Sequence, residues 1–154
     1  MSLIASNIGY DNIIALDHDL EYLKILNSII SELEIINIKP TKYSFGDDFE
    51  SSDVVVMLAL IHWIYSCTSL YGSFDLIFEY LSNHVSYYLI IEWIDPTDNA
   101  IKLFNHIKFN TDIIETDYTE VNFRKSIEKN IGDILKIYDV DGSSRRLNVI
   151  KVIE

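Results

Sequence analysis

The amino-acid sequence predicts a three-layer α/β fold with a mostly parallel sheet and a C-terminal antiparallel β-hairpin. Apolar runs of strand length alternate with segments of helical periodicity, which is typical of parallel sheets that helices cover on both faces. After Gly132 the periodicity changes, and Asp141-Gly142 lies between two strand-like runs, residues 134–140 and 146–153. An Asp-Gly pair in that position is a strong hairpin signal.

The first predicted elements are a helix, a strand and a second helix. Residues 2–7 are apolar and Gly9 is a plausible C-cap, which indicates the last turns of a helix whose beginning is absent. Residues 12–16 (NIIAL) form an apolar run that ends at Asp17, as in a strand buried on both faces. An amphipathic helix follows, because apolar residues recur at helical spacing on one face, namely Leu20, Leu23, Leu26, Ile30 and Leu33, with Ile25 and Ile29 beside them.

Two strands with a polar turn between them are predicted next. Residues 35–41 favour a short strand that ends at Pro40, since proline cannot serve in a central ladder. Residues 43–52 (YSFGDDFESS) are typical of a polar turn, and residues 53–58 (DVVVML) of another buried strand. Residues 59–65 continue into a loop or a helix.

A helix, a strand and two more helices are predicted before the hairpin. Ser73 can cap the first of these helices, and residues 87–93 (YYLIIEW) form the strand. Thr97 or Asp98 can cap the second helix and Thr119 the third. The side chains expected to face the core are Phe74, Ile77, Phe78 and Leu81 in the first helix, Ile101, Leu103, Phe104 and Ile107 in the second, and Val121, Phe123 and Ile127 in the third.

Composition and charge exclude several classes of protein. Twelve basic residues against twenty-four acidic ones leave a net charge of −12, which disfavours binding to nucleic acid through its phosphates. No apolar segment approaches the ~20 residues that a membrane-spanning helix needs. Cys67 has no partner for an internal disulfide, which fits a reducing cytoplasm, and we expect it to be a buried thiol. The chain is therefore expected to be a single cytoplasmic domain over residues 1–154.

Polar residues just after the strands are the candidates for binding, because ligands of doubly wound sheets lie outside the carboxyl ends of the strands. Asp17 ends the first strand and can accept hydrogen bonds from both hydroxyls of a ribose, or it can cap the helix that follows. Asp19 directly precedes that helix and is the better cap, which leaves Asp17 for a ligand. His18, His84 and His106 lie on separate elements without metal-ligand spacing, so no metal site is expected.

Four segments carry motifs in a recognisable order: IIALDHD at 13–19, LALIHW at 58–63, IIEWIDPTD at 90–98, and DYT at 117–119 followed by Phe123. They resemble, in turn, the second strand, the "ALxHH" signature after the fourth strand, the "EWxxPxD" stretch after the fifth and the "DYT…F" segment before the sixth strand of class I S-adenosylmethionine-dependent methyltransferases. The C-terminal hairpin is similar to the antiparallel seventh strand of that family. The resemblance implies a Rossmann-like fold.

The resemblance also implies S-adenosylmethionine (SAM) as the cofactor. Asp17 would bind its ribose, with His18 beside it, and either Asp47 or Asp48 would contact the amino group of the adenine. The segment from Leu58 through Ala59 to Leu60 would line the methionine side of the cofactor pocket.

The same resemblance implies that His62, Trp63, Glu92 and Trp93 face the substrate. His62 has an ordinary pKa of ~6.5, which suits a general base. The alternative, which the strand-end position makes less favoured, is a satisfied core residue. Methyl transfer from a sulfonium often needs only proximity and in-line alignment, so a catalytic base is not required. The expected acceptor is an oxygen or nitrogen atom of a small molecule, or one presented by a partner protein.

One part of the family pattern has no counterpart in this sequence. The family's first strand and glycine-rich loop bind the methionine part of SAM, and Gly9 is the only glycine before Asp17. The domain is therefore expected to be N-terminally incomplete, as a fragment or a natural truncation, and its activity in this form is left open. The alternative is a non-catalytic interaction module whose exposed strand edge or apolar face binds a partner protein, a second copy or the missing N-terminal region.

Overall fold

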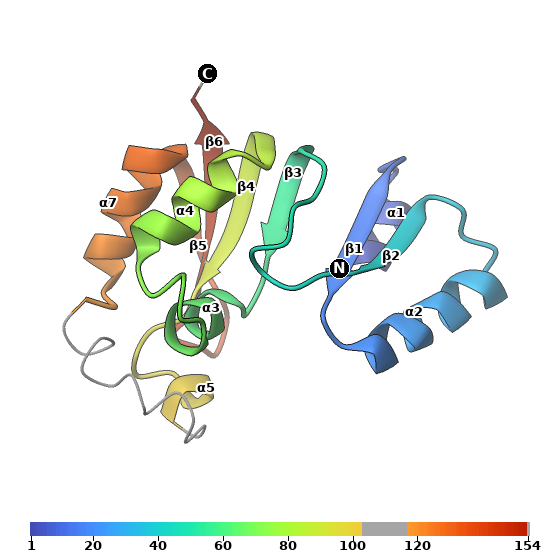
Figure 1. Ribbon diagram of the computed structural model, residues 1–154, viewed down its shortest axis with the longest axis horizontal. Coiled ribbons are helices and arrows are strands. Elements are labelled where there is room, and N and C mark those ends of the chain that lie inside the picture. Colours follow the sequence, from blue (N-terminus) through green and yellow to red (C-terminus); the bar gives the residue numbers. More distant parts are fainter. Residues whose placement is uncertain (103–116, 154) are drawn as a thin grey trace. The chain divides into compact units, whose positions relative to one another are not determined.

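The computed structural model describes residues 1–102 and 117–153, except for the side chains of Ala100 and Lys102 (Figure 1). The chain divides into two compact units, Met1–Asp48 and Phe49–Glu154, here called the first unit and the second unit. Each unit is described by itself.

The first unit is a β-α-β arrangement preceded by a short helix. Its elements in chain order are α1 (Ser2–Asn7), β1 (Ile13–Asp17), α2 (Leu20–Glu32) and β2 (Ile38–Lys42). The two strands pair in parallel, with Ile13 opposite Ile38 and Asp17 opposite Lys42. Asn37 joins α1 to the start of β2, because it accepts a hydrogen bond from Ser6 Oγ at 2.7 Å and donates one to the Tyr10 carbonyl at 2.6 Å.

One expectation for the first unit is wrong, and the predicted amphipathic helix is confirmed as α2. The second strand does not end at Pro40, which lies inside β2 opposite Ala15. Since β2 pairs only with β1 among the described residues, the missing N–H of Pro40 breaks no ladder on its other edge. The apolar stripe of α2 is largely uncovered: Leu23 is buried, whereas Leu20, Ile25 and Leu33 are more than half exposed.

The second unit contains one four-stranded mixed sheet and the helices that pack on it. Its strands are β3 (Ser52–Met57), β4 (Val85–Trp93), β5 (Gly132–Asp139) and β6 (Arg146–Val152), in the spatial order β3-β4-β6-β5. β3 and β4 pair in parallel, whereas β6 is antiparallel to both β4 and β5. The described helices of this unit are α3 (Ile61–Cys67), α4 (Phe74–Ser82), α5 (Asn99–Lys102) and α7 (Glu120–Asn130).

α4 and α7 pack on each other and on the sheet, and they enclose the core (Figure 1). The predicted caps are confirmed, because the side chains of Ser73 and Thr119 accept backbone hydrogen bonds at the starts of α4 and α7. All four predicted core residues of α4 are buried, as are Phe123 and Ile127 of α7. Val121 is an error of the prediction: it is 62% exposed, because two residues of helix place it about 200° around the axis from Phe123. Leu103, Phe104 and Ile107 lie outside the described residues.

The α/β class, the parallel strand pairs and the antiparallel C-terminal hairpin are confirmed. The parallel strands, which the sequence leads us to expect in one sheet, belong to two sheets in the described structure. Cys67 is exposed rather than buried, since it is the last residue of α3. No described helix is long and apolar enough to cross a membrane. The single domain over residues 1–154 stays a prediction.

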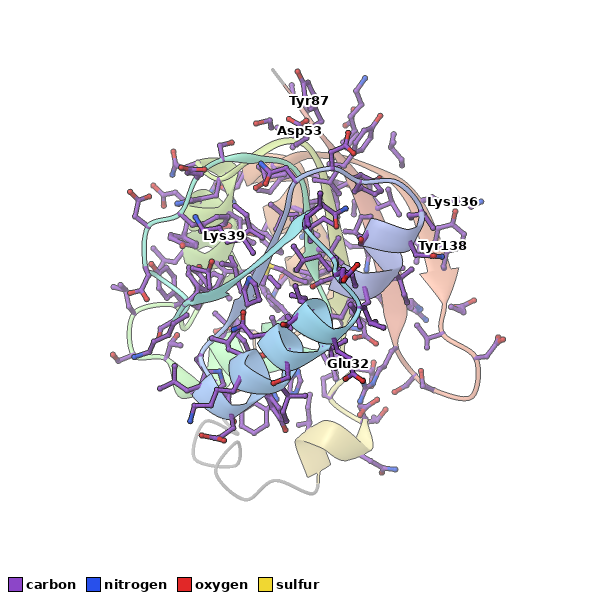
Figure 2. All side chains as sticks on the ribbon, turned by 90° about the vertical axis from the view of Figure 1, so that its right-hand side faces the viewer. Glu32, Lys39, Asp53, Tyr87, Lys136 and Tyr138 are labelled. Atoms are coloured by element: carbon purple, nitrogen blue, oxygen red, sulfur yellow. The ribbon has the colours of Figure 1, made fainter. Side chains whose placement is uncertain are left out.

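The side chains of β5 alternate between two faces, as expected for a strand. Lys136 and Tyr138 project from the same face of its outer edge, and the Lys136 ammonium lies 4.5 Å from the centre of the Tyr138 ring (Figure 2). Both residues pair with β6, opposite Val149 and Leu147. This edge of the sheet is therefore covered in part by a charged side chain, which protects a strand edge against unwanted pairing.

Candidate functional site

In the first unit, the candidate residues lie where β1 ends and α2 begins. Asp17 Oδ1 accepts a hydrogen bond from the Asp19 backbone N–H at 2.9 Å, and Asp17 Oδ2 has no partner among the described residues. Asp19 Oδ1 accepts from the Glu21 N–H at 2.8 Å, so Asp19 is the N-cap of α2, as predicted. Because a different residue caps the helix, Asp17 keeps one carboxylate oxygen for a ligand. Its side chain is 40% exposed.

The other candidates of the first unit are more exposed. The imidazole of His18 is 84% exposed, and its Nδ1 lies 3.6 Å from Asp17 Oδ1. Asp47 and Asp48 are exposed in the loop after β2. Asp47 Oδ2 accepts from the Ser44 N–H at 2.9 Å, while the Asp47 N–H donates to the Ser44 carbonyl at 2.9 Å. Asp47 therefore stabilises its own turn, and a role toward adenine stays a prediction for both aspartates.

In the second unit, the candidate residues gather where β3 and β4 end. After β3 the chain turns at Leu58, Ala59 and Leu60 before α3 begins. Ala59 has a φ of +53°, in the left-handed region that residues other than glycine rarely adopt. Its N–H donates to Glu92 Oε2 at 2.7 Å, so a carboxylate from β4 holds this turn.

Glu92 belongs to a buried network of charges. Arg145, from the loop between β5 and β6, lies with its Nη1 3.6 Å from Glu92 Oε1. The same guanidinium donates two hydrogen bonds to Asp98, from Nε at 3.0 Å and from Nη2 at 3.2 Å. These contacts raise the pKa of Arg145, chiefly through the hydrogen bond to Asp98, and the arginine remains charged. The network joins the loops that follow β3, β4 and β5.

His62 lies in the first turn of α3 and is only 1% exposed. Neither ring nitrogen has a hydrogen-bond partner within the ranges 1–102 and 117–153. Burial, and next the positive charge of Arg145, lower the pKa of His62 from 6.5 to about 4, against a smaller opposite effect of Asp98. The imidazole is therefore neutral at pH 7. Buried polar groups without a partner are rare in proteins, and they often mark functional positions.

The two tryptophans have different surroundings. Trp63 is half-buried beside His62, with the two ring centres 5.5 Å apart. Trp93 is 1% exposed and stacks on Tyr118 at 4.8 Å in the aromatic core. One edge of Trp93 borders a pocket of about 400 Å³ that is lined further by Asp95, Pro96, Thr97, Tyr118, Thr119 and Glu120.

Sequence reasoning named seven of these second-unit residues and missed two. It selected the residues at the ends of two apolar strands, which are Leu58, Ala59, Leu60, His62, Trp63, Glu92 and Trp93. It gave no role at the site to Arg145 and took Asp98 only as a helix cap. A signal for this pair was present, since Asp98 lies in a strand-end segment and Arg145 lies three residues after a hairpin glycine. The fold brings them together across 47 residues of sequence.

No family model and no curated protein matches this chain. Solved structures do match it over nearly its whole length. WbdD has 13% identity and a TM-score of 0.69, over 97% of this chain and 32% of that one. Magnesium protoporphyrin IX methyltransferase (ChlM) from Synechocystis PCC 6803, crystallised with bound SAH, has 12% identity and a TM-score of 0.68, over 99% of this chain and 68% of that one.

The N-methyltransferase NodS from Bradyrhizobium japonicum WM9 is similar at 10% identity, with a TM-score of 0.62 over 93% of this chain and 74% of that one. The chain thus spans about a third of the length of WbdD and about two thirds to three quarters of the two methyltransferases. The chain therefore has the Rossmann-like fold of class I methyltransferases.

Proposed function

We propose that this chain is a SAM-dependent methyltransferase domain that acts on an oxygen or nitrogen atom of a small molecule or of a group presented by a partner protein. The observation that carries the proposal is the likeness of its fold to ChlM and NodS over 93–99% of the chain. The polar groups after β1, β3 and β4 support it, because they lie at the strand ends where this class of fold binds ligands. A cytoplasmic location belongs to the same proposal.

Part of a SAM site fits the residues present. The unpartnered Oδ2 of Asp17 suits the hydroxyls of a ribose, since a carboxylate is a strong acceptor of hydrogen bonds. Within the second unit, the turn at Leu58, Ala59 and Leu60 offers backbone groups and apolar side chains. No glycine-rich turn precedes Asp17 in residues 1–16. When bound, SAM supplies an electrophilic methyl group on a sulfonium.

The residues of the second unit have distinct roles in this proposal. The neutral imidazole of His62 would accept a hydrogen bond from the acceptor's O–H or N–H group and would take up that proton. The methyl group would leave the sulfonium sulfur for the acceptor atom, with S-adenosylhomocysteine as the other product. The lowered pKa of His62 makes it a weak base, so it suits an acceptor that becomes strongly acidic on methylation. Trp63 lies beside His62 and would shape the acceptor side together with Glu92, whereas Trp93 packs in the aromatic core.

Titration of S-adenosylhomocysteine (SAH) into the 154-residue chain by isothermal calorimetry tests the proposal. We expect one binding site, and we expect the Asp17→Ala variant to bind at least about tenfold more weakly, because a hydrogen bond to a charged group is worth roughly 1.5–3 kcal/mol. Asp11→Ala, which removes an exposed aspartate of the same unit, is the matched control and should bind like the wild type. Absence of SAH binding at millimolar concentration would reject the proposal.

A second candidate is a non-catalytic module that binds a partner protein. The observation in its favour is the uncovered apolar surface of the first unit, where Ile8, Leu20, Ile25, Leu33 and Ile36 are all more than half exposed. Surfaces of this kind mark protein interaction sites. This candidate requires self-association or partner binding without SAH binding. A monomer in light scattering that binds SAH would exclude it.

A further inference from the structure

The loops that follow β3, β4 and β5 meet at the guanidinium of Arg145, which contacts Asp98 and Glu92. Asp98 holds the guanidinium by two hydrogen bonds of 3.0 and 3.2 Å, and Glu92 Oε1 lies 3.6 Å from Nη1. The side chains of Glu92 and Asp98 are 10% and 8% exposed, so water screens these charges little.

The other oxygen of Glu92 points to the turn after β3. Glu92 Oε2 accepts the Ala59 N–H at 2.7 Å, and Ala59 has a φ of +53°. A residue with a side chain keeps such a φ only when its surroundings compensate for the strain. The hydrogen bond that the Ala59 N–H donates to the Glu92 carboxylate provides that compensation here, and it fixes the segment that leads directly into α3 and His62.

The position of the Glu92 side chain depends in turn on Arg145. A buried carboxylate needs a cation or hydrogen-bond donors nearby to offset its desolvation. Asp98 orients the guanidinium, so the two carboxylates share one positive charge. If Arg145 is removed, Glu92 loses its charged partner and can turn toward water, which weakens its hydrogen bond to the Ala59 N–H.

We propose that Arg145 is a positioning residue, which acts through Glu92 to hold the Ala59 turn in the conformation that faces the ligand. That the turn faces a ligand rests on the proposed function, whereas the coupling between Arg145 and Ala59 does not. The loop between β5 and β6 thus sets the shape of the site at the end of β3, although it follows that turn by more than eighty residues of sequence.

Amide hydrogen exchange of the full chain, followed by NMR, tests this coupling. In Arg145→Met, the Ala59 amide should exchange about tenfold faster, since it loses a hydrogen bond to a charged group. The amides that pair β4 with β6 should keep their wild-type rates, which a general loss of stability would change. Arg146→Met is the matched control. Arg146 lies on the same hairpin, but it binds Glu120 of α7 and Asp139 of β5, so its substitution should leave Ala59 unchanged.

A double variant tests the route through Glu92. In Glu92→Gln the side-chain oxygen can still accept the Ala59 N–H but needs no cation, so adding Arg145→Met should change the exchange of Ala59 less than twofold. If Arg145→Met does not fold, Arg145→Lys keeps the charge without the planar fork and should give a smaller acceleration at Ala59 alone. Unchanged protection of Ala59 in the folded Arg145 variant, or equal acceleration in the Glu92→Gln background, would overturn the proposal.

Binding of SAH to the same variants separates this inference from the proposed function. If the wild type binds SAH, Arg145→Met should bind it several-fold more weakly, and the double variant with Glu92→Gln should regain the affinity of Glu92→Gln alone. If the wild type does not bind SAH, the proposed function fails and the exchange data still decide the coupling.

Discussion

The first and second units use similar sequence patterns but differ in how much they bury. Among the described residues, three apolar side chains are buried in the first unit and nineteen in the second. The first unit has only two paired strands, and such a sheet is marginal without further packing. The second unit packs two helices on four strands. The same amphipathic helix pattern therefore makes a core only where a second layer covers it.

The two units also differ in how they treat polar groups at their strand ends. Asp17 is partly exposed, and one of its carboxylate oxygens has no hydrogen-bond partner among the described residues, so water solvates its charge. His62, Glu92 and Asp98 are buried, and the two carboxylates form ion pairs with Arg145. Substitutions at Asp17 should therefore change ligand binding and disturb only the adjoining start of α2, whereas those near Arg145 should change binding and the structure of three loops.

The largest expected effect tests the core of the second unit. Phe123 is fully buried against Phe74, Phe78 and Trp93, so Phe123→Ala should lower the free energy of unfolding by about 3–5 kcal/mol. Urea unfolding followed by tryptophan fluorescence reports on this unit, because both tryptophans lie in it. Val121→Ala, on the exposed side of the same helix, should stay within about 0.5 kcal/mol of the wild type. Equal effects of the two substitutions would contradict the described core.

An intermediate effect concerns the pH dependence of the second unit. The folded pKa of His62 is lowered from 6.5 to about 4, so the unfolded chain binds a proton at this site first. The stability that depends on neutral His62 is complete above pH 6.5 and is lost as the pH falls to about 4, by at most about 3 kcal/mol. Urea unfolding at several pH values measures this loss.

The histidine substitutions complete the pH experiment. His62→Gln should remove most of the slope between pH 6.5 and pH 4. His18→Gln changes an exposed histidine of the first unit and should retain the wild-type slope. A slope that survives in His62→Gln would place its origin in other groups.

The smallest effect tests the first unit. Asp19 caps α2, so Asp19→Ala should destabilise this helix by about 1 kcal/mol. The amides of α2 should then exchange about fivefold faster, while the urea transition of the tryptophans stays unchanged. If the second unit loses stability to the same extent, the two units unfold as one cooperative body, and the contrast between them disappears.

Much of the local structure could be predicted because local interactions determine it. The caps at Asp19, Ser73 and Thr119 follow from a polar side chain placed before an apolar helical pattern. The Asp141-Gly142 turn follows from backbone preferences, and Gly142 has the expected positive φ of 72°. The candidate residues of the site were found for the same reason, since they follow strands that are evident from their apolar runs.

The rest depended on contacts between distant segments. Pro40 within β2, the exposed Val121 and the exposed Cys67 each depend on which neighbours an element meets, and periodicity does not specify those neighbours. In the sequence, Arg145 is a charged residue beside a hairpin turn, with no visible partner. The folded hairpin brings it into contact with Asp98 and Glu92.

The sequence by itself thus determined the α/β class, the helix starts, the hairpin and the strand ends at which binding is expected. Only the tertiary structure decided that the parallel strands form two sheets, that His62 is buried without a partner, and that one arginine joins three loops. The physical reason is that backbone preferences and apolar periodicity act over a few residues. Burial and charge pairing, by contrast, are properties of segments that meet only after folding.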